Sequence, residues 1–239
     1  IENGFYGRIN LGEIIGNGFY KDNILSFSSF TADNEKGNIT GSAFLPVELD
    51  YNSADFGGKM HHKPVDVTVK GRFNHMDFLT DYVSTTDSLR GTVNIDLSIS
   101  GVWDQLVRNG TLTLENCRLY SKSFDNPITK IEGQGTLKNN ILSFDRFLCV
   151  KSANNSNEKN LFVNGEIDLT YFFKPDYDLQ ITGKDILFES ITDEIEGNVN
   201  LNLNISGRDT VSMIGTIGLN ELTLLKEFNT SVLTDEEHE

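Results

Sequence analysis

Residues 91–101 read GTVNIDLSISG, and residues 197–207 read GNVNLNLNISG. In both stretches, apolar and polar side chains alternate strictly between two flanking glycines. Successive side chains of a β-strand point to opposite faces, so each stretch is predicted to be a strand with one apolar and one polar face. A polar face is typical of antiparallel sheet, because parallel sheets are normally covered on both sides.

The same period of two recurs in several other stretches. Apolar and polar residues alternate at 65–70, and the apolar residues at 112–114, 167–169 and 177–181 are spaced by two. Glycines separate many of these runs, as expected for turns and bulges between strands. The predicted fold class is therefore mostly β, an elongated antiparallel sheet.

One segment near 74–86 has helical spacing instead. Phe78 and Tyr82 lie four residues apart behind Asn74, which is a favourable N-cap residue. A short helix is predicted there.

The chain contains an internal repeat. Residues 16–30 and 133–147 are identical at nine of fifteen positions, and the two stretches quoted first match at an offset of 106. The copies pair approximately 16–50 with 133–171 and 64–115 with 175–220. We expect residues 1–239 to form one continuous repeat-built β domain that is a piece of a longer protein.

Two local features of the repeat can be predicted as well. Apolar spacing slips at the same point within 25–30 and 142–147, which indicates a β-bulge in each copy. Lys138-Asn139-Asn140 precedes a new strand and is predicted to form a tight hairpin, since asparagine tolerates a positive φ angle.

Composition excludes several functional classes. The net charge of -15 from 35 acidic and 20 basic residues argues against a nucleic-acid partner. The two cysteines, Cys117 and Cys149, are too few for a disulfide framework and are expected to be buried free thiols. His61 and His62 would point to opposite faces of a strand, so they chelate one metal poorly. No motif indicates an enzyme, a cofactor or a metal site.

The order of these motifs resembles a known family. The pattern G-x-V-x-I/L-x-L-x-I-S-G is followed by GTLTL at 110–114 and by IEGQGTLKNNILSF at 131–144. This arrangement is similar to the repeats of AsmA-like and TamB-like proteins. The resemblance implies a β-taco, in which the sheet curls into a long U-shaped groove with an apolar lining. It also implies a periplasmic protein tethered to the inner membrane of a diderm bacterium by an anchor outside this sequence.

The expected function follows from that resemblance. The chain would be a non-enzymatic segment that shields the acyl chains of phospholipid, or of another lipid, during transport between the inner and outer membranes. Its other partners would be neighbouring repeats of the same longer chain. The alternation itself also fits a closed β-sandwich or barrel, and then a structural or adhesin-type domain with a dry core. The predicted groove lining consists of Val93, Ile95, Leu97, Ile99, Leu112, Leu114, Leu137, Leu142, Phe144, Ile167, Leu169, Val199, Leu201, Leu203 and Ile205.

Overall fold

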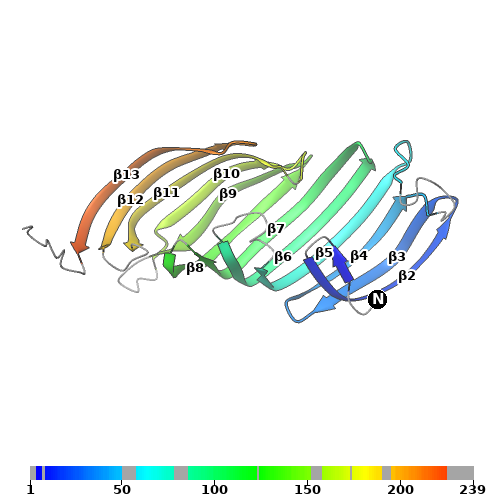
Figure 1. Ribbon diagram of the computed structural model, residues 1–239, viewed down its shortest axis with the longest axis horizontal. Helices are drawn as coiled ribbons and strands as arrows, with labels where there is room; N and C mark the ends of the chain where they lie inside the picture. Colours follow the sequence, from blue (N-terminus) through cyan, green and yellow to red (C-terminus); the bar gives the residue numbers. More distant parts are fainter. Residues whose placement is uncertain are drawn as a thin grey trace, which may run out of the picture.

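The computed structural model describes residues 4–6, 9–49, 58–77, 86–122, 124–151, 158–172, 174–189 and 195–224. They form one antiparallel sheet of 13 strands, whose order in space is their order along the chain (Figure 1). The strands are β1 (Gly4–Tyr6), β2 (Ile9–Lys21), β3 (Ile24–Asn34), β4 (Gly37–Pro46), β5 (Val65–Met76), β6 (Thr86–Val102), β7 (Gln105–Ser121), β8 (Phe124–Lys138), β9 (Ile141–Val150), β10 (Leu161–Asp168), β11 (Asp176–Glu189), β12 (Ile195–Gly207) and β13 (Ser212–Leu224).

The sheet is open rather than closed. Its strand order begins at β1 and ends at β13, and these two strands do not pair with each other. Within the described ranges no second sheet or helix layer covers either face. The closed sandwich or barrel, which the alternation equally allowed, is therefore not the fold; the elongated, curled antiparallel sheet is.

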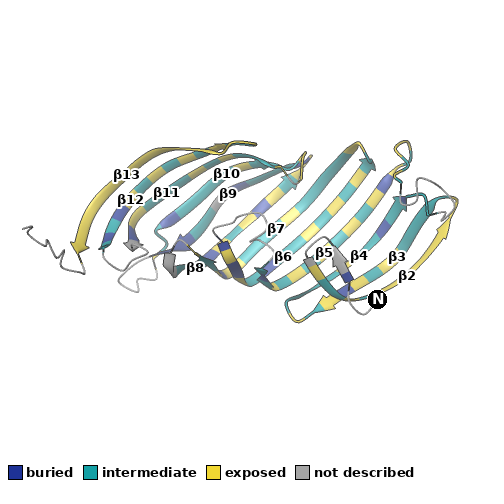
Figure 2. Cartoon of the chain, in the orientation of Figure 1, coloured by how far each residue is buried: buried dark blue, intermediate teal, exposed yellow. Residues whose placement is uncertain are grey.

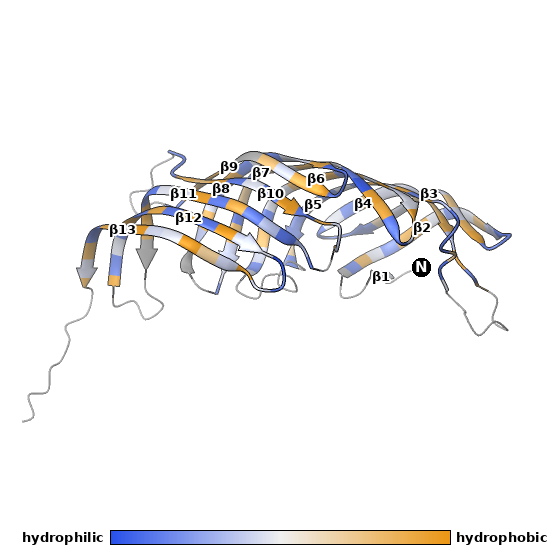
Figure 3. Ribbon diagram, turned by 90° about the horizontal axis from the view of Figure 1, so that it is seen from above, coloured by the Kyte–Doolittle hydropathy of each residue, from blue (hydrophilic) through white to orange (hydrophobic). Residues whose placement is uncertain are grey.

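The sheet is curled along its strands and arched over its length (Figures 1 and 3). Val93 is 1% exposed and Cys117 0% exposed, although the described residues form only one layer of sheet around them. A single sheet can bury side chains to this extent only on the inner side of a bend. The apolar face is therefore the concave one, here called the groove face, and the opposite face is the polar face.

The bend lies where the strand ladders are irregular. Register shifts occur at Gly91 of β6, beside Cys117 of β7, beside Ile186 of β11 and beside Val199 of β12. Bulges of this kind bend a strand and increase its twist. At Gly91 φ is 130°, and a Cβ atom would lie 2.6 Å from Cα of Cys117, so only glycine fits this bend.

The local features predicted from the repeat are confirmed. Asn139 and Asn140 have φ angles of 51° and 71°, and Asp22 and Asn23 form the equivalent turn with 53° and 61°. In β3 the two residues between Phe27 and Phe30 oppose one residue of β4, and β9 carries the same bulge against β10. By position in the repeat, β2–β7 correspond to β8–β13.

The helix predicted near 74–86 is wrong at both ends. Residues 74–76 continue β5, where His75 pairs with Arg90 and Met76 with Leu89, and Thr86 begins β6. Ladder pairing with β6 thus overrides the local helical spacing, and residues 78–85 lie outside the described part of the chain.

Candidate functional site

Strand register gathers the predicted lining residues on the groove face. Directly opposed residues of an antiparallel pair project to the same side of the sheet. Ile95 of β6 is opposed to Leu112 of β7. The second copy repeats this arrangement on β12 and β13, where Leu201 is opposed to Ile217. Figure 3 shows the resulting alternation of hydrophobic and hydrophilic positions along the strands.

The floor of the groove is a continuous row of buried side chains. It crosses eight strands, from Met76 of β5 to Val199 of β12. Figure 2 shows these buried positions as dark bands that recur from strand to strand. The row consists of Met76, Leu89, Val93, Cys117, Ile131, Cys149, Leu161, Ile186 and Val199.

Six of the predicted lining residues belong to this floor or pack directly against it, and a seventh, Phe144, is buried outside the row. Val93 and Val199 are part of the buried row, and Phe144, which is 6% exposed, is also buried. The others that contact the row are Ile95, Leu112, Leu114 and Leu201.

The remaining predicted residues line the wall above the floor. They are half-buried, while the polar residues that alternate with them on β6 and β12 are mostly exposed. Leu169 differs, because β10 ends at Asp168 and the Leu169 amide donates instead to the Asn140 carbonyl. The wall residues are Leu97, Ile99, Leu137, Leu142, Ile167, Leu203 and Ile205.

Sequence reasoning missed much of the floor itself. Cys117, Ile131 and Ile186 lie at or beyond register shifts, where a bulge changes which face each successive residue occupies. Counting by twos from Leu114 therefore leads away from Cys117. The apolar spacing changes after Leu114, as it does within 25–30 and 142–147. This change could have predicted the bulge in β7.

Glycines make room for large side chains on the groove face. Leu97 is opposed to Gly110, and Leu114 is opposed to Gly133. At Gly133 a Cβ atom would lie 1.9 Å from the ring of Phe147, which itself stacks on Phe144 at 4.6 Å between ring centroids. An aromatic ring thus covers a glycine of the neighbouring strand, and this arrangement smooths the floor.

Side chains of the floor are largely removed from water. Burial raises the pKa of the Cys149 thiol to about 11 and raises the pKa of Cys117 as well. Both cysteines are free and buried, as the sequence predicted. Their thiols therefore stay protonated near neutral pH and present a neutral, apolar surface.

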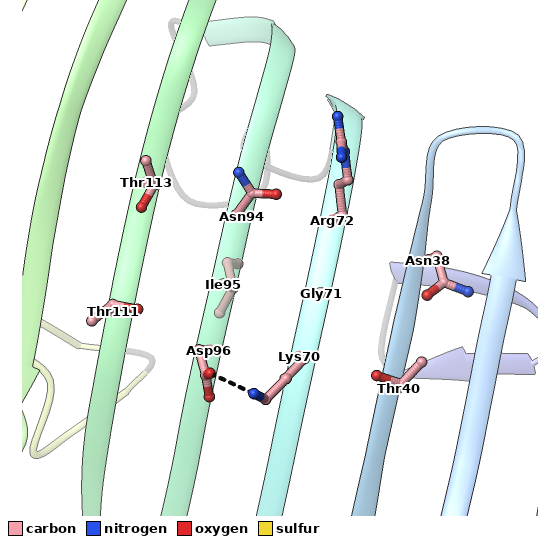
Figure 4. A pocket seen from close by; sticks show the side chains of 10 residues that line it. All are labelled: Asn38, Thr40, Lys70, Gly71, Arg72, Asn94, Ile95, Asp96, Thr111 and Thr113. Carbon is pink, nitrogen blue, oxygen red and sulfur yellow. Dashed lines mark ion pairs between the residues drawn. The ribbon is translucent and has the colours of Figure 1, made fainter.

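The polar face carries a shallow hollow of 320 Å³ across β4–β7 (Figure 4). Lys70 and Asp96 form an ion pair at 3.1 Å there, and their side chains are 72% and 56% exposed. Exposed pairs contribute about 0–1 kcal/mol. The ten lining residues include no histidine or cysteine. They are Asn38, Thr40, Lys70, Gly71, Arg72, Asn94, Ile95, Asp96, Thr111 and Thr113.

Comparison with known proteins returned no match: no protein-family model, no curated protein and no solved structure resembles the chain closely enough. In the described part of the chain no helix is long and apolar enough to cross a membrane. The same residues hold no cluster of three or more side chains suited to a metal ion. Function is therefore inferred from the groove and from the resemblance of the sequence.

Proposed function

We propose that the groove binds and conducts the acyl chains of phospholipids or of similar lipids. The supporting observation is the set of half-buried apolar wall residues beside the buried floor from β5 to β12, over which the described residues place no covering layer. Apolar surface left in water costs about 25 cal/mol per Å². Large exposed apolar surfaces therefore generally mark sites that a partner or ligand covers.

The dimensions favour several chains over one tightly held ligand. Thirteen strands about 4.8 Å apart extend the sheet over roughly 58 Å. One acyl chain spans about half of a 30 Å hydrocarbon core, or about 15 Å. The groove is thus several acyl chains long, and a long channel of nearly uniform apolar lining suits movement along it better than recognition of one headgroup.

From the family resemblance we propose that this activity belongs to the cell envelope. By analogy with AsmA-like and TamB-like proteins, the chain is a segment of a periplasmic bridge, tethered to the inner membrane by a part outside this sequence. Phospholipid would pass along it toward the outer membrane, with its headgroup in water and its acyl chains on the groove face. No enzymatic step is needed for this role.

The test uses two neighbouring positions on β12. Leu203 lies half-buried on the groove face, whereas Asn202 is exposed on the polar face. The variants Leu203→Asp and Asn202→Asp add the same charge one residue apart, so the polar-face variant controls for charge itself. The purified proteins are incubated with vesicles that contain phosphatidylethanolamine carrying a photoactivatable acyl chain, then irradiated and analysed by mass spectrometry.

We expect the parent protein and Asn202→Asp to crosslink to lipid on groove-face residues. Leu203→Asp should lose most of this crosslinking, because an acyl chain cannot solvate a carboxylate. Its melting temperature should stay close to that of the parent, since the carboxylate can reach water in an empty groove. Absence of crosslinking in the parent protein would refute the proposal, as would equal crosslinking in the two variants.

A third variant tests whether water reaches the wall of the groove. Val93 is 1% exposed, so an unpaired carboxylate from Val93→Asp should cost several kcal/mol and destabilise the fold strongly. If Leu203→Asp melted as low as Val93→Asp, the wall would be as inaccessible to water as the floor. The domain would then act as a structural element with a dry interior rather than as a lipid channel.

A further inference from the structure

Arg108 of β7 is a charged side chain on the groove face. It is opposed to Ile99 of β6, and the next pair on the same face is Leu97 with Gly110. Among the residues that the described strand ladders pair directly, Arg108 is the one charged side chain whose register places it on this face. A residue that breaks an otherwise consistent alternation often marks a functional position.

The internal repeat shows that the strand pair itself does not need a charge there. Two residues before the matching stretches GTLTL and GTIGL, the first copy has Arg108 and the second has Met213. Met213 is opposed to Ile205, the counterpart of Ile99, so the two positions have the same place in the register. The second copy thus forms the same pair with an uncharged side chain, and Arg108 points to a role beyond folding.

Contacts with the neighbouring hairpins hold the guanidinium of Arg108 at the rim of the groove, where these strands end. Its Nη1 donates to Oδ1 of Asn140 and to the Leu169 carbonyl, both at 3.2 Å. Its guanidinium carbon lies 5.8 Å from the centre of the Phe172 ring. Asn140 belongs to the β8–β9 turn and Leu169 follows β10, so the side chain reaches from β7 across that turn. A planar guanidinium held in one orientation is well suited to bind phosphate oxygens.

An apolar track leads from Arg108 to the floor. The groove-face residues that follow Ile99 toward the floor along β6 are Leu97, Ile95 and Val93. Val93 is part of the floor. The strand from Ile99 to Val93 covers about 20 Å at roughly 3.4 Å per residue. An acyl chain spans about 15 Å, half the hydrocarbon core of a bilayer. A lipid with its phosphate at Arg108 would therefore have room for its whole chain on this track.

We propose that Arg108 binds the phosphate of a phospholipid whose acyl chain lies on the track from Ile99 to Val93. This inference rests on the proposed function and names the ligand class more closely, as a lipid that carries a phosphate group. An apolar groove alone would accept any acyl chain, whereas a fixed cation favours phosphate-bearing lipids over uncharged ones such as diacylglycerol. Phosphate is common to phospholipid headgroups, so the contact does not select one of them. Arg108 is half-buried, which leaves the rest of the headgroup in water.

Two variants and two lipid probes test this contact. Arg108→Met introduces the residue of the second copy, and it keeps the bond from the backbone amide of residue 108 to Oδ1 of Asn140. Arg72→Met is the control, because it removes the same charge from an exposed position on the polar face of β5. The probes are phosphatidic acid and diacylglycerol with identical acyl chains that carry a photoactivatable group at the chain end. Each probe is offered in micelles of an uncharged detergent, so that no other phosphate competes, and the crosslinked residues are identified by mass spectrometry after irradiation.

We expect the parent protein and Arg72→Met to crosslink phosphatidic acid about ten times more than diacylglycerol, the effect of one charge-assisted hydrogen bond. The phosphatidic acid crosslinks should gather around Val93 and Leu114, at the floor end of the track. Arg108→Met should crosslink both probes at the diacylglycerol level, with the crosslinks spread over the groove. Inorganic phosphate in excess over the lipid should leave the preference of the parent protein unchanged, because it has no acyl chain to hold it on the track.

The failure of this inference can be told apart from that of the proposed function. Equal crosslinking of the two probes by the parent protein would overturn the inference and leave the proposed function intact, as would equal loss of the preference in Arg108→Met and Arg72→Met. Loss of diacylglycerol crosslinking in Arg108→Met would assign Arg108 a structural role instead. Loss of the preference in inorganic phosphate would identify a site for free phosphate rather than for a lipid. If the parent protein crosslinked neither probe, the proposed function would be wrong and this inference with it.

Discussion

Gly133 and Gly135 should respond very differently to the same substitution. Both lie on the groove face of β8, two residues apart, and neither has a positive φ. A Cβ atom at Gly133 would lie 1.9 Å from Cδ1 and 2.6 Å from Cε1 of Phe147. At Gly135 the nearest atom would be the flexible end of Leu142 at 3.0 Å. Gly133→Ala therefore forces an aromatic ring to move, and Gly135→Ala does not.

The cost can be assembled from the contacts. Moving the Phe147 ring breaks its stacking on Phe144, worth about 0.5–1.5 kcal/mol. A displaced side chain off its rotamer adds about 0.5–1.5 kcal/mol. Replacing glycine by alanine returns about 0.4–1 kcal/mol through the unfolded chain. Gly133→Ala should thus lose about 1–2 kcal/mol, whereas Gly135→Ala should stay within about 0.5 kcal/mol of the parent.

Urea unfolding followed by far-ultraviolet circular dichroism measures both variants. The double variant Gly133→Ala with Phe147→Ala removes the ring that is struck, so its loss of stability should be smaller than the sum of the two single losses. If Gly133→Ala and Gly135→Ala unfold at the same urea concentration, or if the double variant is additive, the account of ring-over-glycine packing is wrong.

Three further predictions concern ionisation and the hairpin. The folded pKa of the Cys149 thiol is about 11 against an ordinary value of 9.0, so the protonated thiol stabilises the fold fully below pH 9. About 2–3 kcal/mol of the free energy of unfolding is lost as the pH rises to 11, and alkaline melts of Cys149→Ala should lack this loss. A hydrogen bond from Lys36 lowers the pKa of Asp77 below its ordinary 3.8, so the ionised carboxylate stabilises the fold above that value and this stabilisation is lost as the pH falls further. Thermal melts over a series of acid pH values should show a weaker pH dependence for Asp77→Asn. Asn140→Gly gives a favourable Asn-Gly turn but removes three side-chain hydrogen bonds to Arg108 and Leu106. Urea unfolding should show a net loss of about 1–3 kcal/mol in the free energy of unfolding, while the control Asn139→Gly should stay near the parent.

The faces of the strands could be predicted from the sequence because period-two alternation determines them directly. Residues 91–101 and 197–207 lie in β6 and β12 with their apolar residues inward. The hairpin at Asn139-Asn140 was likewise predictable, since a positive φ at two consecutive residues strongly selects asparagine and glycine. Such features depend on local chemistry alone.

The features that could not be predicted depend on partners distant in sequence. The strand at His75 and Met76 is decided by pairing with β6, which local spacing does not reveal. Cys117 and Ile186 reach the floor only because bulges shift their parity. The sequence also did not determine whether the sheet is open or closed, since a sandwich and a curled sheet require the same alternation. It is decided by the linear strand order from β1 to β13.

That linear order has a consequence for how the chain reaches its native state. Every strand pairs only with its neighbours in sequence, so each new hairpin can dock on the edge left by the one before. Short loop closures cost little entropy, and local pairing is favourable for rapid folding. The sheet can therefore be assembled progressively while the chain emerges end first from a ribosome or a membrane channel. Pulling on one terminus should likewise peel the strands away one after another.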